Sequence, residues 1–437
     1  MAKISVRDRN KNNADRKPNW EYRFEAAKSN GKRHHISKSG FRTKREAEVA
    51  GIKALAEYNN AGLHFEPSEI GFNDYIDYWY KQYCVTNLKY NTLVTYTNLI
   101  EKHLKPHFGR YKLKSLNPSV LQDYANEIVK QGYSSSYVFG ILSTLKTALD
   151  YAVFPLNYIK DNPIIYIRFP AKNPPKSSRE VISMEDFDRI MEQFPFGTRF
   201  HIPLLFGWFC GLRISEALAV TWDDIDFDEK TLNINKQLVK RNTVQKDSFK
   251  ETYTKTGRDC AWYFGIPKYG SSRVIKLGDF LLDELKKELA RQQKNEEKYG
   301  VHYTIQLLKD EQDEKGNSIK RIVPEQKGVG SDLPRVNFVC VDENGLFTTK
   351  DNIRYPTKVI QEKLKIKFDF HSLRHTHATM LIDGGVSPKA VQQRLGHKNV
   401  ATTLQIYVKP TENMQQEAVD TFDKIMSKHS MLHGEAI

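Results

Sequence analysis

The 437-residue sequence has few cysteines and no long apolar run. Its four cysteines, Cys84, Cys210, Cys260 and Cys340, are scattered, which argues against a disulfide framework and against a cysteine-rich zinc site. The longest nearly uninterrupted apolar run, residues 202–212, is too short to span a bilayer, and no charged segment followed by an apolar one opens the chain. We therefore expect a soluble protein of the reducing cytoplasm, with no membrane partner.

Positive charge is what the chain has in excess, with 67 Lys and Arg against 53 Asp and Glu and a formal charge of +14. Residues 1–65 hold 15 basic and 7 acidic side chains, a net charge of +8, whereas residues 66–165 are nearly neutral at +1. Such a balance suits a polyanionic partner, either nucleic acid or an acidic membrane surface. The basic N-terminal stretch is the first candidate for a separate DNA contact.

Alternating polar and apolar side chains in the first 65 residues predict three short strands, and Thr43 to Glu46 form a capping box that predicts a helix start. An Asn-Gly pair at residues 30–31 marks the turn of a hairpin between the last two strands. The basic side chains along these strands are Arg7, Arg9, Arg23, Lys32, Arg33 and Lys38. Because a strand ribbon fits the major groove of DNA, we predict that this domain binds DNA; a solvated basic face is the alternative.

The following stretch, residues 66–165, predicts an all-helical domain. Its four amphipathic segments are residues 69–83, 91–108, 118–130 and 135–154. Residues 166–180 are rich in proline and lysine, which predicts an extended linker whose Lys172 and Lys176 contact DNA phosphates.

Residues 181–437 mix helix and strand signals and predict an α+β domain. The apolar run 202–212 predicts a buried helix that ends near Gly211 and delivers Arg213 to a pocket, with Glu216 one turn further on. Strand patterns cover residues 222–234, 261–266 and 272–277. Residues 236–259 have the character of an insertion, and residues 294–330, which are polar without periodicity, predict an irregular surface excursion.

Near the C-terminus, His371, Arg374, His397 and Tyr407 gather a guanidinium, two imidazoles and a phenol within 37 residues. A guanidinium fits phosphate oxygens bidentately, imidazoles bond phosphate or move protons near neutral pH, and a tyrosine hydroxyl is a possible covalent nucleophile. Together these groups predict phosphoryl transfer through a phosphotyrosine.

These residues, in the motifs His371-Ser-Leu-Arg-His-Thr376 and Leu395-Gly-His397, with Gly211-Leu-Arg-Ile-Ser-Glu216 upstream, resemble the catalytic domain of the tyrosine recombinases of phages and conjugative transposons. The resemblance implies a multidomain protein. Its domains are an arm-site DNA-binding domain (residues 1–65), a helical core-binding domain (66–165), a linker (166–180) and a catalytic domain with a C-terminal tail helix (181–437).

The resemblance also implies roles for single residues. Arg213 and Arg374 clamp the scissile phosphate, which His371 and His397 also contact, and Tyr407 is the nucleophile. His371 accepts the tyrosine proton, and Glu216 braces the site. Lys268 is implied as the general acid, because it precedes Ser-Arg-Val-Ile-Lys-Leu, although Lys255 in Thr-Lys-Thr-Gly is a competitor.

Metal ligation by His371, His375 and His377 is the rival interpretation of the histidines, but no His-Glu-x-x-His motif accompanies them, so we expect no metal. We expect no cofactor either, because the covalent link retains the energy of the phosphodiester. The predicted function is site-specific recombination by a homotetramer on double-stranded DNA, through a Holliday junction, in association with the bacterial nucleoid. An excisionase or a host DNA-bending protein is a further possible partner.

Two alternatives stay open. A type IB topoisomerase has a similar catalytic set but religates the same strand. A DNA-binding regulator would use the fold without cleavage, and it would have no need of Arg213, Arg374 and Tyr407.

Overall fold

The fold comes from a computed structural model that describes residues 4–11, 17–29, 32–59, 68–169, 181–243, 260–313 and 315–399, with Asp420 and Asp423; the side chains of residues 26–29, 32–34 and 56–59 are not included. The chain forms two compact units. One holds residues 1–88 and 95–172, and the other holds residues 89–94 and 173–437. None of the described helices is long and apolar enough to cross a bilayer. None of the four cysteines, all within the described residues, forms a disulfide.

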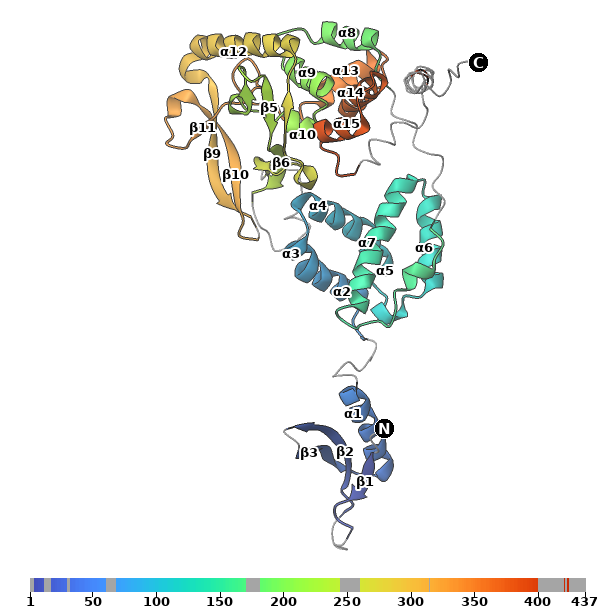
Figure 1. The fold of residues 1–437 in the computed structure, drawn as a ribbon. Helices are drawn as coiled ribbons and strands as arrows, with labels where there is room; N and C mark the ends of the chain where they lie inside the picture. Colours follow the sequence, from blue (N-terminus) through green and yellow to red (C-terminus); the bar gives the residue numbers. More distant parts are fainter. Residues whose placement is uncertain are drawn as a thin grey trace, which may run out of the picture. The chain divides into compact units, whose positions relative to one another are not determined.

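The N-terminal part is an antiparallel sheet with one helix (Figure 1). It consists of β1 (Ser5–Asp8), β2 (Trp20–Ser29), β3 (Lys32–Phe41) and α1 (Lys44–Asn59). Tyr22 and Phe24 of the central strand are buried with Ala47 of the helix, because alternate strand residues face the same side of a sheet. The backbone nitrogen of Glu46 donates to Thr43 Oγ1 at 3.2 Å, and the Glu46 carboxylate accepts from the backbone of Thr43. The predicted strands, helix and capping box are confirmed.

The next part is helical, as the sequence predicted. Its segments are α2 (Phe72–Trp79), α3 (Val85–Asn87), α4 (Tyr90–Leu99), α5 (Lys105–Phe108), α6 (Pro118–Lys130) and α7 (Ser135–Val153), with π-helical turns at Tyr80–Cys84 and Ile100–Leu104. Asn117 and Ser134 cap α6 and α7 by accepting backbone N–H groups. Residues 170–180 of the predicted linker lie outside the described residues.

A helix that is apolar on all sides lies at the centre of the second unit. This helix, α9 (His201–Cys210), is buried almost throughout, which is expected of a helix without a polar face. Around it lie α8 (Met184–Gln193), α10 (Ile214–Ala217), α13 (Arg354–Glu362), α14 (Phe370–Asp383) and α15 (Pro388–Leu395). A Cβ on Gly207 would lie 2.7 Å from Leu373 Cδ1, so α14 packs directly against the α9 backbone. The predicted buried helix is confirmed.

Two antiparallel sheets complete this unit. The small sheet has the order β4-β5-β8, from β4 (Ile225–Asp226), β5 (Thr231–Ile234) and β8 (Arg273–Lys276). The larger sheet has the order β11-β9-β10-β7-β6, from β6 (Gln237–Asn242), β7 (Cys260–Gly265), β9 (Thr304–Gln312), β10 (Ser318–Gln326) and β11 (Arg335–Val336). Since β7 and β8 belong to different sheets, the loop between them joins two sheets and is not a hairpin turn.

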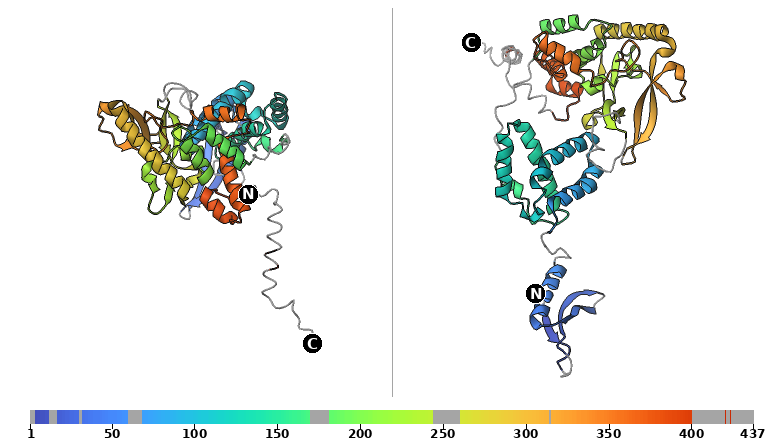
Figure 2. Two further views of the ribbon diagram at one scale, coloured as in Figure 1. Left: turned by 90° about the horizontal axis from the view of Figure 1, so that it is seen from above. Right: turned by 180° about the vertical axis from the view of Figure 1, so that it is seen from behind.

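The irregular excursion predicted for residues 294–330 is wrong. Helix α12 (Asp279–Tyr299) covers its beginning, and β9 and β10 pair in register over nine residues as a long ribbon (Figures 1 and 2). Only Ile322 of β10 is buried, and charged pairs such as Arg321 with Glu311 lie across the two strands. Because few side chains of β9 and β10 are buried, the sequence lacks the alternating apolar pattern that predicts a strand.

Candidate active site

Arg213 is placed by the end of α9. Gly211 ends the helix in the left-handed conformation, with φ of 61°, which favours glycine. A Cβ at Gly211 would also lie 2.5 Å from Leu395 Cδ2 and 2.8 Å from His377 Cδ2. The chain therefore turns sharply at Gly211, and Arg213 becomes the N-cap residue of α10.

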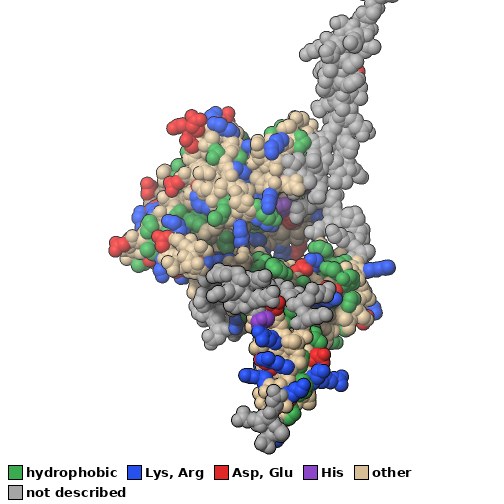
Figure 3. All heavy atoms as spheres, turned by 60° about the horizontal axis from the view of Figure 1, so that its bottom comes forward, with side chains coloured by type: hydrophobic (Ala, Val, Ile, Leu, Met, Phe, Trp, Pro, Cys, Tyr) green, Lys and Arg blue, Asp and Glu red, His purple; other side chains and the backbone are tan. Residues whose placement is uncertain are grey.

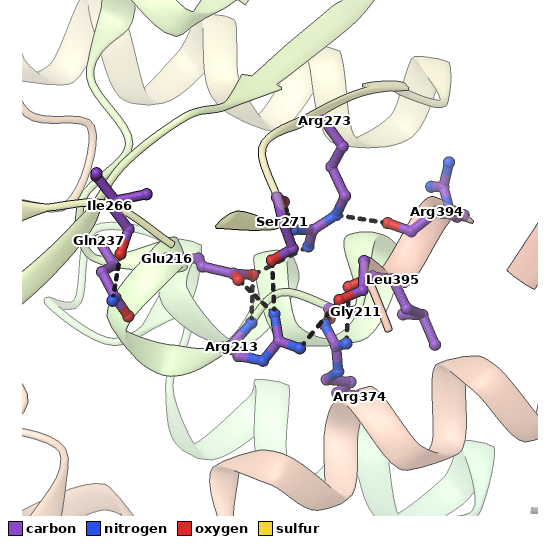
Figure 4. Close-up of polar contacts among 11 residues, drawn as sticks. Gly211, Arg213, Glu216, Gln237, Ile266, Ser271, Arg273, Arg374, Arg394 and Leu395 are labelled. Carbon is purple, nitrogen blue, oxygen red and sulfur yellow. Dashed lines mark hydrogen bonds and ion pairs between the residues drawn. The ribbon is translucent and has the colours of Figure 1, made fainter. Parts of the chain in front are cut away.

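Glu216 on α10 binds Arg213 through both carboxylate oxygens. Its side chain is fully buried, and Oε1 accepts from Arg213 Nη1 at 2.6 Å while Oε2 accepts from the Arg213 backbone at 3.1 Å. Oε2 also accepts from Arg273 Nη2 at 3.0 Å (Figure 4). Burial alone would raise the pKa of Glu216, but Arg273, Arg213 and Arg374 outweigh it and lower that pKa. Glu216 is thus ionised at neutral pH.

Arg374, one turn after His371 on α14, is only 2% exposed. Its Nη1 donates to the Gly211 carbonyl and its Nη2 to the Leu395 carbonyl, each at 2.7 Å (Figure 4). Burial and the neighbouring Arg213 lower the pKa of Arg374 to about 9, which leaves it charged at neutral pH. Its Nε is buried and has no hydrogen-bond partner among the described residues. A buried unpaired donor on a cation suits an anionic ligand.

His371 and His397 are both partly buried. His397 follows Gly396, which ends α15 with φ of 68°. Burial lowers the pKa of His397 to about 4, and Arg374, Arg213, His371 and Arg273 add to that effect. A neutral imidazole beside two arginines can donate a hydrogen bond to a phosphate oxygen without adding charge.

Lys268 is exposed on the loop between β7 and β8, with Nζ 5.1 Å from the centre of the Tyr269 ring. Three residues on, Ser271 Oγ accepts from Arg213 Nη1 at 3.5 Å. Tyr269, Ser271, Gly396 and His397 line one hollow of about 220 Å³. The structure therefore brings the Lys268 loop beside Arg213 and His397, whereas its competitor Lys255 lies outside the described residues.

The nucleophile assignment stays a prediction, because Tyr407 lies outside the described residues, as do Lys172 and Lys176. Of the predicted arm-domain contacts, Arg7 Nε donates to Glu21 at 2.9 Å and Arg9 to Ser39 at 3.3 Å. Arg23 lies on β2 and Lys38 on β3, while the side chains of Lys32 and Arg33 are not described. Figure 3 shows Lys and Arg side chains gathered on this N-terminal part.

Sequence reasoning missed Arg273 and Arg394, which complete the site, and it named His377 only as a metal ligand in the rival interpretation of the histidines. His377 Nδ1 donates to the Trp208 carbonyl at 2.8 Å, and its Nε2 accepts from Arg394 Nε at 3.2 Å. The two arginines could have been found in the sequence only by their position next to recognised motifs. Arg394 directly precedes Leu-Gly-His, and Arg273 follows the Lys268 loop. Within the described ranges, no three His, Cys, Asp or Glu side chains are grouped so that they could hold a metal ion.

Three family descriptions match this chain. Residues 181–414 match the phage integrase family, residues 71–129 match the SAM-like N-terminal domain of phage integrases, and residues 5–58 match an arm DNA-binding domain.

Similar proteins come from bacteria, phages and transposons. A tyrosine recombinase XerC-like protein of Caldanaerobacter subterraneus subsp. tengcongensis is 26% identical over 391 residues, which cover 88% of this chain and 90% of that protein. The integrase of Staphylococcus phage L54a is 23% identical, with 83% and 95% covered. The transposase of transposon Tn916 from Enterococcus faecalis is 23% identical, with 76% and 70% covered.

Two solved structures share the fold. The Tn1549 transposon integrase, in complex with transposon right end DNA, is similar with a TM-score of 0.58 and 18% identity, over 80% of this chain and 98% of that one. A lambda integrase tetramer bound to a Holliday junction gives a TM-score of 0.51 and 16% identity, over 92% and 94% of the two chains.

Proposed function

The chain belongs to the phage integrase family of tyrosine recombinases, and from that premise we propose that it is the integrase of a mobile element, a site-specific recombinase that cleaves and rejoins DNA through a 3′-phosphotyrosine. The observation that carries this proposal is the charge arrangement of the site. The guanidiniums of Arg213, Arg273 and Arg374 act on the buried carboxylate of Glu216, and these four groups together carry a net charge of +2.

A phosphodiester matches that charge. Its non-bridging oxygens repel nucleophiles, and its alkoxide is a poor leaving group, so a catalyst must neutralise charge and protonate the departing oxygen. Arg374 offers its unpaired Nε, and Arg213 lies at the rim of the site with a partly exposed side chain. Because Glu216 and three backbone carbonyls already hold these two guanidiniums, they need little reorganisation when the phosphate arrives.

Tyr407 Oη attacks the phosphorus, and the bond from phosphorus to the 5′ oxygen breaks. The phenol proton passes to His371, and Lys268 protonates the 5′ oxygen. A free phenol titrates near pH 10, so nearby cations and a base are both needed to activate it. His397, neutral by virtue of its low pKa, donates a hydrogen bond to the phosphate. A 5′ hydroxyl of the partner duplex then attacks the phosphotyrosine and releases Tyr407.

Each domain of the chain is assigned a DNA contact or a catalytic role in this reaction. We assign residues 1–65 to arm sites, 66–165 to a clamp on core DNA, 166–180 to the linker, and 181–437 to catalysis. Four protomers exchange strands in pairs through a Holliday junction. An excision factor or a host DNA-bending protein would act in the bacterial cytoplasm together with this assembly. A type IB topoisomerase needs no arm domain, and a regulator needs no buried arginine cluster, so both alternatives fit this chain less well.

A suicide substrate with a nick next to the scissile phosphate tests the proposal. After cleavage the short fragment that carries the 5′ hydroxyl diffuses away, so religation cannot occur and the covalent adduct accumulates. The wild type should form a denaturation-resistant protein–DNA species, and Tyr407→Phe should bind the DNA without forming one. Tyr355→Phe is a matched control, since Tyr355 is an exposed tyrosine of the same unit. An adduct in Tyr407→Phe would move the nucleophile elsewhere, and no adduct in the wild type on its own element's ends would refute the proposal.

A further inference from the structure

Three successive backbone carbonyls before His397 each accept a hydrogen bond from a different arginine. The Arg394 carbonyl accepts from Arg273 Nε at 2.7 Å. The Leu395 carbonyl accepts from Arg374 Nη2 at 2.7 Å (Figure 4). The Gly396 carbonyl accepts from Arg213 Nη2 at 3.3 Å. The short segment 394–397 is therefore the common support of the two arginines that face the phosphate, and it carries His397 itself.

Arg394 fixes this segment to the rest of the unit. Its Nη2 donates to the Phe209 carbonyl and its Nη1 to the Lys276 carbonyl, each at 3.1 Å. Phe209 lies in the last turn of α9, where carbonyls have no partner within the helix and a positive charge is favourable. One guanidinium thus connects α15 to α9 and to β8.

His377 completes the Arg394 anchor from α14. Its Nδ1 donates to the Trp208 carbonyl, so its Nε2 is free to accept from Arg394 Nε. Burial lowers the pKa of His377 to about 4, with Arg394 adding to the effect, so the imidazole keeps this neutral form at neutral pH. Protonation would put two cations face to face.

Arg273 reaches the same segment from β8. Its side chain is only 7% exposed, and its three nitrogens donate to the Arg394 carbonyl, the Ser271 carbonyl and Glu216. A Cβ on Gly396 would lie 3.1 Å from Arg273 Nη1 and 3.0 Å from Ser271 Cβ, so the backbone and this guanidinium are in close contact. Each Arg273 nitrogen thus has a protein acceptor, which distinguishes Arg273 from Arg374.

We propose that Arg394 and Arg273 are positioning residues, which hold segment 394–397 so that Arg213, Arg374 and His397 keep one geometry toward the scissile phosphate. They act through these three residues and do not touch the DNA. The effect of Arg394 and Arg273 on catalysis rests on the proposed function. Their hold on segment 394–397 does not depend on it.

The geometric part is tested without DNA, by NMR titration of the full-length protein with ¹³C-labelled histidine, with the His397 signal assigned through His397→Gln. In the wild type this signal should titrate near pH 4. In Arg394→Met it should move toward 6.5, the ordinary histidine value. The largest causes of the low pKa of His397 are burial, Arg374, Arg213, His371 and Arg273, so such a shift in Arg394→Met reports movement of the segment.

Arg291→Met is the matched control, because Arg291 is a mostly buried arginine of the same unit that pairs with Glu288 on α12. It should leave the His397 titration unchanged, and Arg394→Lys should give a smaller shift than Arg394→Met. If His397 titrates alike in the wild type and Arg394→Met, or shifts equally in Arg291→Met, the positioning role is refuted.

The catalytic part is tested by single-turnover cleavage of the suicide substrate. Arg273→Gln should slow adduct formation about 100-fold, the cost of a misplacement of about 1 Å, while leaving DNA binding unchanged. In a methylphosphonate substrate a methyl group replaces one non-bridging oxygen, so the scissile group is uncharged. Its cleavage therefore depends less on charge neutralisation by Arg213. On it the deficit of Arg273→Gln should shrink, whereas Arg291→Gln should affect both substrates equally.

Normal cleavage by Arg273→Gln, or an equal deficit on both substrates, would overturn the role of Arg273. A wild type that forms no adduct at all would instead refute the proposed function, and the histidine titration would still decide whether segment 394–397 is held by Arg394.

Discussion

The same ion pair, arginine with glutamate, occurs in both units of the molecule and is built differently. Arg7 and Glu21 join β1 and β2 through an arginine side chain that is 64% exposed, whereas Arg213 in the catalytic unit is 18% exposed and its partner Glu216 is fully buried. Glu216 also binds a second arginine, Arg273. An exposed guanidinium is screened by salt, and its side chain can reach a phosphate from several directions. A buried guanidinium keeps one orientation. The first design suits binding, and the second suits catalysis.

The largest expected difference between substitutions in the two ion pairs is in the rate of DNA cleavage. Arg213→Ala should slow covalent adduct formation about 1,000-fold, because it removes a preorganised donor to the phosphate. Arg7→Ala should leave cleavage of an isolated core site at the wild-type rate. Quenched single-turnover assays with saturating DNA measure both, and similar rates for the two variants would break the comparison.

The next difference is in stability. Glu216→Gln leaves the guanidiniums of Arg213 and Arg273, which are 18% and 7% exposed, without their counter-charge and should lower the free energy of unfolding by about 3 kcal/mol. Glu21→Gln leaves an arginine that water can solvate, so the loss should be below about 1 kcal/mol. Urea denaturation, followed separately for the two units by site-specific fluorescence, measures both losses. A larger loss in Glu21→Gln would contradict the stated difference between the pairs.

Burial in the catalytic unit should also make its stability depend on pH through His377. The folded pKa is about 4 and the ordinary value is 6.5, so between these values the unfolded state binds a proton that the folded state does not. The free energy of unfolding should therefore fall as the pH falls from about 6.5 to 4, by up to about 3 kcal/mol for this group. Denaturation at a series of pH values should show a flatter curve for His377→Gln, and an unchanged curve would show that His377 is not the group responsible.

The smallest effect should come from the exposed arginine. Arg7→Ala in the full chain should weaken binding to arm-site DNA modestly and reduce the slope of log K against log salt by about 1, as expected for one lost phosphate contact. Titrations at several salt concentrations measure this slope. Lys298→Ala, at an exposed lysine that pairs with Glu343 in the catalytic unit, is the control and should keep the wild-type slope.

Local signals were sufficient for much of the fold. Thr43 and Glu46 marked the start of α1, the uninterrupted apolar run predicted α9 and its end at Gly211, and amphipathic periodicity predicted the helices between residues 72 and 153. These features depend on neighbours within one or two turns, so a sequence pattern contains them. The ribbon of β9 and β10 was missed because its pairing depends on the partner strand and not on a local apolar pattern.

For the site, the sequence by itself supplied the candidate groups, which are two arginines, two histidines, a glutamate, a lysine and a tyrosine, in motifs typical of the family. Only the tertiary structure decided how these groups are held. Arg273 and Arg394 are ordinary surface candidates in sequence, since a lone arginine is usually exposed. They become internal supports because the end of α9, strand β8 and the end of α15 lie together, and the backbone carbonyls of Phe209, Lys276 and Arg394 accept hydrogen bonds there. That meeting joins residues more than 180 positions apart, and no local pattern contains it.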